Sequence, residues 1–149
     1  MPDGRPVEFR LGKVGEVIGA EIFDGRTRLS FSEPLGSGDA VDYLSVRLDG
    51  PSLSASRQVY AGWHEGFEIL ARYFDDLAAS WRGWEGERVF ESIERDLRIA
   101  ATHDGHVQMG ILLWECSQPG GWRVQAELRL DAGEQLASAA RDVAALVRR

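Results

Sequence analysis

Residues 96–115 of the chain, DLRIAATHDGHVQMGILLWE, carry two runs of alternating apolar residues on either side of one Asp-Gly pair. Apolar residues at every second position are typical of a strand with one buried face. An Asp-Gly pair between two such runs is a strong signal for a hairpin turn, and strands joined by a short turn must run antiparallel. This segment therefore predicts an antiparallel hairpin, and its neighbours along the chain extend the same pattern.

The register of this hairpin depends on which residues must share a face. A two-residue turn at 104–105 would pair His103 with His106 and divide the apolar residues between the two faces. A three-residue loop over 103–105, with its glycine left-handed, pairs Thr102 with His106 instead. That register places six apolar residues on one face: Leu97, Ile99, Ala101, Val107, Met109 and Ile111. Because a one-residue slip would turn every side chain to the other face, burial favours the three-residue loop.

The two histidines of this hairpin are candidate metal ligands. A zinc site needs at least three protein ligands, and the nearest thiol, Cys116, lies ten residues beyond His106 on the same predicted strand. Ten residues span roughly 33 Å at ~3.3 Å per residue, so these side chains cannot share a metal or form a Cys-His nucleophile. The motifs G-x-G-x-x-G, G-x-x-x-x-G-K-[ST] and G-x-S-x-G are also absent from the sequence. We therefore predict no metal, no cofactor and no catalytic residue.

Strand patterns also fill the first part of the chain. Three ranges alternate in polarity: 6–11, 16–23 and 26–31. A two-residue turn at Asp24-Gly25 would align apolar residues from both neighbouring strands, pairing Ile22 with Thr27, Ala20 with Leu29, and Ile18 with Phe31. A helix over 14–22 has suitable apolar spacing, but Gly15 and Gly19 would each cost it about 1 kcal/mol, so we favour strands.

Two segments, 63–82 and 132–148, have the three- and four-residue apolar spacing of a helix with one buried stripe. For the first helix we expect a stripe that ends at Trp81, with Gly62 as the N-cap and Gly83 just beyond the C-terminus.

The second helix begins with a capping-box pattern. Asp131 is the expected N-cap, and Glu134 lies three residues later. Arg148 and Arg149 suit the negative end of its dipole.

The remaining strand patterns complete an α+β chain. They cover 41–48, 53–60, 87–92, 96–102, 106–115 and 121–130, with loops at 33–40, 49–51 and 116–121. We predict one domain over residues 1–149: an antiparallel sheet or half-open barrel of about eight strands, whose helices cover one face.

Charge and composition exclude several classes of function. The formal net charge is −7 and Lys13 is the only lysine, so the clustered cations that nucleic acid requires are missing. An acidic surface instead favours a basic partner. A lone cysteine, a start without a signal-peptide pattern and the lack of any long apolar run predict a cytoplasmic protein without a membrane segment.

The segment WRGWEGERVFESIERD, residues 81–96, combines tryptophans with many acids. We predict that it binds a partner through five residues: Trp84, Glu85, Glu87, Glu91 and Glu94. A solvated strand edge balanced by Arg88 and Arg95 is the structural alternative, and paired carboxylates for acid-base chemistry are a further one.

A second candidate site is an apolar pocket between sheet and helices. Its predicted lining comprises His106, Trp114, Trp122 and Tyr60, and it would take a small ligand. A hydrolase that uses His106 with a carboxylate is the catalytic alternative.

Residues 81–143 resemble an uncharacterised bacterial family that is itself similar to the WapI-type immunity proteins of contact-dependent wall-associated toxins. The shared pattern is a helix ending near W-x-G, an acidic turn, a D-G-H-V hairpin, a strand with tryptophan and a final helix opening near EQL. The resemblance implies a small cytoplasmic protein that neutralises a basic protein toxin by direct binding, and it carries over no catalytic residue. Alternatives are a small-ligand-binding domain or a non-catalytic domain of another role.

Overall fold

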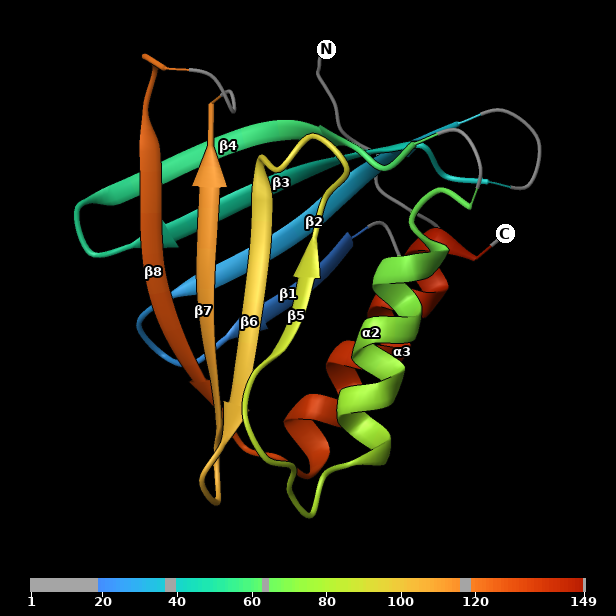
Figure 1. Ribbon diagram of the computed structural model, residues 1–149, viewed down its shortest axis with the longest axis vertical. Coiled ribbons are helices and arrows are strands. Elements are labelled where there is room, and N and C mark those ends of the chain that lie inside the picture. Colours follow the sequence, from blue (N-terminus) through green and yellow to red (C-terminus); the bar gives the residue numbers. More distant parts are fainter. Residues whose placement is uncertain (1–18, 37–39, 63–64, 116–118, 149) are drawn as a thin grey trace, which may run out of the picture.

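The computed structural model describes residues 19–36, 40–62, 65–115 and 119–148 (Figure 1). The predicted strand at 6–11, the pairing of Ile18, and Cys116 lie outside these ranges. The elements are β1 (Gly19–Phe23), β2 (Arg28–Leu35), β3 (Tyr43–Gly50), β4 (Leu53–Tyr60), α2 (Glu68–Ala79), β5 (Arg88–Glu91), β6 (Leu97–His103), β7 (Val107–Trp114), β8 (Arg123–Leu130) and α3 (Glu134–Val147).

The strands form two antiparallel sheets in chain order, β1-β2-β3-β4 and β5-β6-β7-β8. This confirms the predicted α+β class with eight strands and two helices, while neither sheet closes into a barrel. In Figure 1 the β5–β8 sheet lies in front of the β1–β4 sheet and its strands cross the others at an angle. The sheets approach each other at β4 and β7, and α3 packs against both α2 and β1. In the described ranges, no helix has the length and apolar character needed to span a membrane.

Each sheet contributes its inner face to the core, as strand alternation requires. The inner row of β7 is fully buried from Val107 to Leu113, whereas the residues between them are partly exposed. The α2 stripe of Leu70, Phe74 and Leu77 is buried as predicted, and each such side chain contributes about 1.5–3 kcal/mol. Both sheets and both helices share this cluster of buried residues.

The predicted register of the β6–β7 hairpin is wrong by two residues. His103 pairs with Val107 and Ile99 with Ile111, so the three-residue loop comprises residues 104–106. The Asp104 N–H donates to the His106 carbonyl (3.0 Å) and closes this loop, with Gly105 left-handed at φ 102°. Because the shift is even, every side chain keeps its predicted face.

The β1–β2 hairpin differs in the same way. Ile22 pairs with Leu29 rather than with Thr27, so the loop covers residues 24–27. The Asp24 carboxylate widens this turn, since its Oδ1 accepts the N–H groups of Arg26 (2.9 Å) and Thr27 (2.7 Å). Side-chain bonding of this kind is how aspartate replaces a tighter backbone turn.

The first helix is shorter than the predicted 63–82. It begins at Glu68 because the preceding Phe67 N–H donates to the Val41 carbonyl (2.9 Å), with Gly66 left-handed at φ 60°. Gly62 is therefore not its N-cap. Trp81 lies beyond the helix and is 47% exposed, so it does not end the buried stripe as predicted.

The second helix is also shorter than predicted, beginning at Glu134. Asp131 accepts the Gly133 N–H (2.6 Å), while the Gln135 side chain accepts the Asp131 N–H (2.8 Å). The N-cap is therefore Gly133 rather than Asp131, and no side chain caps the helix, so the predicted capping box is wrong. Asp131 and Gln135 instead bond the backbone of the turn that precedes the helix.

A buried ion pair joins the two sheets. Arg57 on β4 donates to Asp96, at the end of the β5–β6 turn (2.5 Å), and also to the Glu115 carbonyl. Asp96 is 1% exposed, and its other oxygen accepts the Ser92 hydroxyl (2.6 Å). At the other end of the molecule, Asp24 Oδ2 accepts the Arg129 N–H of β8 (3.0 Å). The sheets are thus tied together at two ends.

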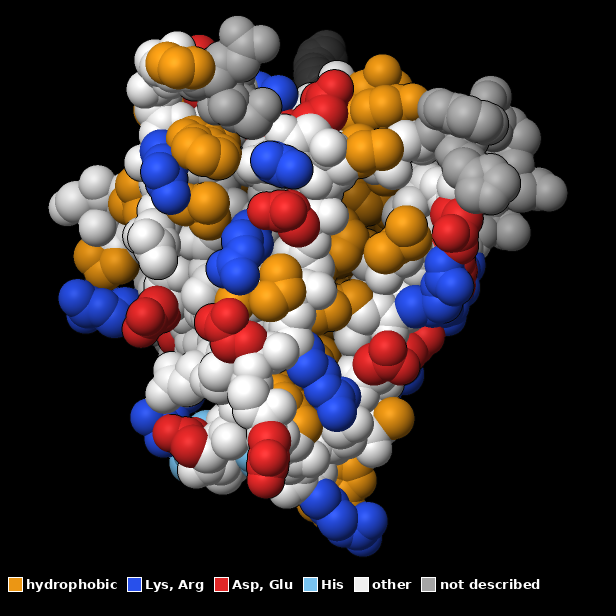
Figure 2. All heavy atoms as spheres, in the orientation of Figure 1, with side chains coloured by type: hydrophobic (Ala, Val, Ile, Leu, Met, Phe, Trp, Pro, Cys, Tyr) orange, Lys and Arg blue, Asp and Glu red, His pale blue; other side chains and the backbone are white. Residues whose placement is uncertain are grey.

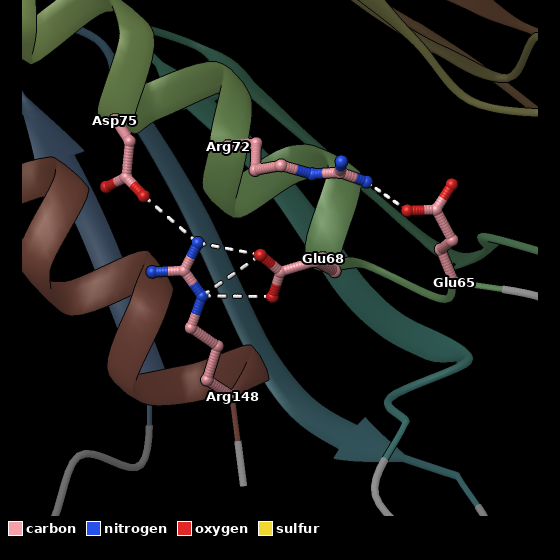
Figure 3. Close-up of polar contacts among 5 residues, drawn as sticks. All are labelled: Glu65, Glu68, Arg72, Asp75 and Arg148. Carbon is pink, nitrogen blue, oxygen red and sulfur yellow. Dashed lines mark hydrogen bonds and ion pairs between the residues drawn. The ribbon is translucent and has the colours of Figure 1, made fainter.

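An exposed ion-pair cluster joins the two helices (Figure 3). Arg148, after the end of α3, bonds Glu68 (2.8–3.2 Å) and Asp75 (3.0 Å), both on α2. Arg148 was predicted to complement its own helix dipole, whereas the structure shows a contact between helices. Its hydrogen bonds lower the pKa of the Glu68 carboxyl below its ordinary value of 4.5.

We expect Asp96→Ala to lower the free energy of unfolding by roughly 3–5 kcal/mol, because it leaves the Arg57 guanidinium unpaired where it is largely buried. Urea unfolding would measure the change, with Glu85→Ala in the exposed turn before β5 as the control. A loss under about 1 kcal/mol would show that the ion pair does not hold the sheets together.

Arg148→Gln should lower the free energy of unfolding by about 0.5 kcal/mol at pH 7, since the pair is exposed. The folded-state pKa of Glu68 is lowered, so this stabilisation is present above pH 4.5 and is lost as the pH falls below it. Denaturant titrations at pH 7 and well below pH 4.5 would test this. Arg26→Gln in the exposed β1–β2 turn is the control, because that side chain has no ion pair with the residues that the structure describes. A stability difference between wild type and Arg148→Gln that persists below pH 4.5 would contradict this expectation.

Candidate functional site

The outer face of the β5–β8 sheet is hollowed by a cavity of about 640 Å³. Figure 2 shows this face, where acidic and basic side chains are interspersed with apolar ones over the strands. All four strands contribute lining residues, and neither helix does. The hollow therefore lies on the side of the sheet away from the core.

The hollow results from small residues in the middle of the sheet. One cross-strand row runs from Val89 through Ala100 and Gly110 to Glu127. Paired residues in such a row share a face, so the two central positions present almost no side chain to solvent. The next row carries Leu112 and the row after it carries Trp114, and both of these larger side chains line the hollow.

Five charged side chains surround this floor. Arg98 lies opposite Glu91 in the register, yet its guanidinium is nearest to Glu87 (3.8 Å). The guanidinium of Arg123 lies over the Trp114 ring, 4.4 Å from its centroid. The carboxylates of Glu91 and Glu127 have no hydrogen bond or ion pair with any residue that the structure describes. Two carboxylates at the hollow are therefore free to accept hydrogen bonds from a cationic group.

The structure divides the predicted partner-binding segment. Glu87 and Glu91 line the hollow, whereas Glu85 and Glu94 are exposed in the turns before and after β5. Trp84 packs against the core, where its Nε1 donates to the Ala101 carbonyl (3.2 Å).

Further ring contacts hold Trp84 in place. The His103 ring meets it edge-on, with 5.1 Å between centroids, and the guanidinium of Arg88 lies 4.9 Å from its centroid. Trp84 thus has a structural role that the sequence pattern did not distinguish from binding.

The four predicted pocket residues occupy different surroundings. Only Trp114 lines the hollow, and it does so on the outer face rather than between sheet and helices. His106 is exposed at the hairpin, where Arg129 lies 3.1 Å from its Nδ1. Tyr60 stacks with Tyr43 across β3 and β4, with 5.0 Å between centroids. Trp122 packs against the core near the start of β8.

Several lining residues were missed from the sequence. Gly110 interrupts a predicted strand, and such a glycine often marks the close approach of a ligand or another backbone. Glu127, Arg98 and Arg123 alternate with apolar residues on their strands and looked like ordinary solvent-facing positions. In the described part of the chain, no group of three or more His, Cys, Asp or Glu side chains is placed to hold a metal ion.

One protein-family model, described as a family of unknown function (DUF6228), matches residues 21–149. No curated protein and no solved structure matches the chain. The match covers residues 81–143, and nothing in these comparisons links the chain to the WapI-type immunity proteins that the sequence pattern suggested.

Trp84→Phe should lower the free energy of unfolding by about 0.5–1.5 kcal/mol, because it removes the donor to the Ala101 carbonyl and keeps an aromatic ring. Trp81→Phe is the matched control, since that exposed indole should change stability by less than about 0.5 kcal/mol. Thermal or urea unfolding gives both values. Equal effects from the two substitutions would argue against a structural role for Trp84.

Proposed function

Because the chain belongs to DUF6228, a family of unknown function, we propose from the site itself that the protein is a small non-catalytic binding protein whose outer β5–β8 face holds a basic protein partner. The observation that carries this proposal is the hollow with two free carboxylates, on a sheet face that neither of the described helices lines. The acids Glu87, Glu91 and Glu127 outnumber the two arginines of its lining.

The charge and the aromatic content of this face support a protein partner. A net charge of −7 would speed the encounter with a basic surface through long-range attraction. Tryptophan and arginine are the residue types most enriched at energetic centres of interfaces, and Trp114 with Arg123 forms a stacked pair of these at one end of the hollow.

The resemblance of residues 81–143 to WapI-type immunity proteins suggests what such a partner would be. We propose a protein toxin that is neutralised in the cytoplasm by direct binding. What supports this is the acidic character of the chain together with a face able to take a cationic surface. Neutralisation of this kind requires occlusion of the toxin and no chemistry from the inhibitor.

A small ligand is the second candidate. A hollow of about 640 Å³ falls within the roughly 300–1,000 Å³ of typical ligand sites. Typical ligand sites are also enclosed and mainly apolar, whereas this one is open and lined by charged groups. The proposal of a protein partner is therefore the stronger one.

Affinity capture with two matched variants would test the binding face. Gln125→Lys adds a cation to the hollow, whereas Gln58→Lys adds one to the exposed outer face of the other sheet. We expect wild type and Gln58→Lys to retain one stoichiometric basic partner from the source cells, and Gln125→Lys to bind it about ten-fold more weakly or worse.

Two results would count against the proposal. Retention of the partner by both variants would place binding elsewhere on the molecule. A small molecule that co-purifies with wild type in native mass spectrometry and is lost only from Gln125→Lys would favour the ligand-binding alternative.

A further inference from the structure

The glycine at the floor of the hollow is not required by the backbone. Gly110 lies in the middle of β7, and its φ is not positive. A Cβ built on it would meet only the Ala100 carbonyl oxygen, at an ordinary 3.9 Å. Gly66 is a contrast, because its φ is 60° and a Cβ there would approach the Val41 carbonyl oxygen to 2.4 Å. The fold would therefore accept a side chain at position 110, and glycine weakens a strand interior.

The missing side chain leaves one carboxylate without a neighbour in its row. Glu127 pairs in register with Gly110, and Ala100 follows on the far side. The side chains in the row of Glu127 therefore include no cation or hydrogen-bond donor that could bind its carboxylate. The strip above Ala100 and Gly110 has room for a side chain that comes from outside the molecule.

The charges around the strip indicate which kind of side chain fits. Glu91 and Glu127 stand in adjacent rows on β5 and β8, two strands that are three strand spacings or roughly 14 Å apart. Neither carboxylate is paired with a residue that the structure describes. The two arginines of the lining already have contacts. Arg98 lies near Glu87, and Arg123 lies over the Trp114 ring. The group that would complement this strip is a cation on an apolar stem, flanked by Leu112 and Val89.

We infer that the strip over Gly110 receives an arginine or lysine side chain of the partner, whose charged end is bound by Glu127 and whose approach is favoured by Glu91. This inference rests on the proposed function, because it names the contact through which the outer face would recognise a basic protein. Hydrogen bonds between a cation and a carboxylate are about twice as strong as neutral ones, so one such contact makes a large contribution to affinity.

Substitution at Gly110 separates this contact from any role in the fold. Gly110→Ala and Gly110→Val place a side chain on the floor, and we expect melting temperatures equal to or above that of wild type, since both residues favour strands more than glycine. Both should weaken partner binding, Val by about ten-fold or more. Gly50→Ala is the matched control: it lies in β3 of the other sheet with a comparable 3.9 Å nearest approach and should leave binding unchanged.

A short cationic peptide tests the chemistry without the partner. Acetyl-Gly-Arg-Gly-amide should shift the backbone NMR signals of Gly110, Glu127 and Ala100, whereas acetyl-Gly-Glu-Gly-amide should not. Glu127→Gln should weaken the arginine peptide about five-fold or more, and Glu94→Gln, in the exposed β5–β6 turn, should not. Equal shifts from both peptides, or an unchanged affinity in Glu127→Gln, would overturn the inference.

The variants also separate this inference from the proposed function. If Gln125→Lys abolishes capture of the partner while Gly110→Val and Glu127→Gln retain it, the outer face binds but not through this strip, and the inference fails alone. If Gln125→Lys retains the partner as well, the proposed function fails with it.

Discussion

Arg57 reaches from the inner face of β4 into the buried end of the β5–β6 hairpin, where the Asp96 carboxylate binds its guanidinium. Taking these charges out of water is costly, and the cost is offset only if each charge is fully hydrogen-bonded. Ser92 and the Glu115 carbonyl complete the bonding. The Asp96 carbonyl also accepts the Trp114 N–H (2.9 Å), so one residue fixes the turn, the end of β7 and the approach of the other sheet.

This junction determines where the helices and the free surface lie. The sheets meet near β4 and β7, and α3 packs against β1 and α2. Tyr73 of α2 reaches the other sheet, where its hydroxyl donates to the Arg88 carbonyl of β5 (3.0 Å). The inner rows of β6 and β7 face the core, so the outer rows of the two strands lie on the opposite side of the sheet. Residues of all four strands line the hollow on that side. The hollow over Gly110 therefore lies on the side of the sheet opposite to the core. Among the described residues no helix lines this face, which therefore remains accessible to a partner.

Strand alternation predicted the faces correctly but not the pairings. In both hairpins the observed register differs from the predicted one by two residues, a shift that keeps every apolar residue inside. Burial cannot distinguish two such registers, because both fill the same face. The hydrogen bonds of Asp24 and Asp104 inside the turns decide between them. Similarly, apolar spacing located both helices, while contacts of residues outside them decided where each begins.

The sequence determined the type of each element in the described ranges, the inner face of each strand and the acidic character of the molecule, because period, composition and charge are local properties. Arg57 already stood in the apolar row of its strand, with Ala55 and Val59 on either side. Its partner Asp96 lies 39 residues away, and no local pattern joins the two. Only the tertiary structure brought Ala100, Gly110 and Glu127 into one row and separated Trp84 from the acids beside it. Cross-strand neighbours are set by register and sheet order, which depend on contacts between distant parts of the chain.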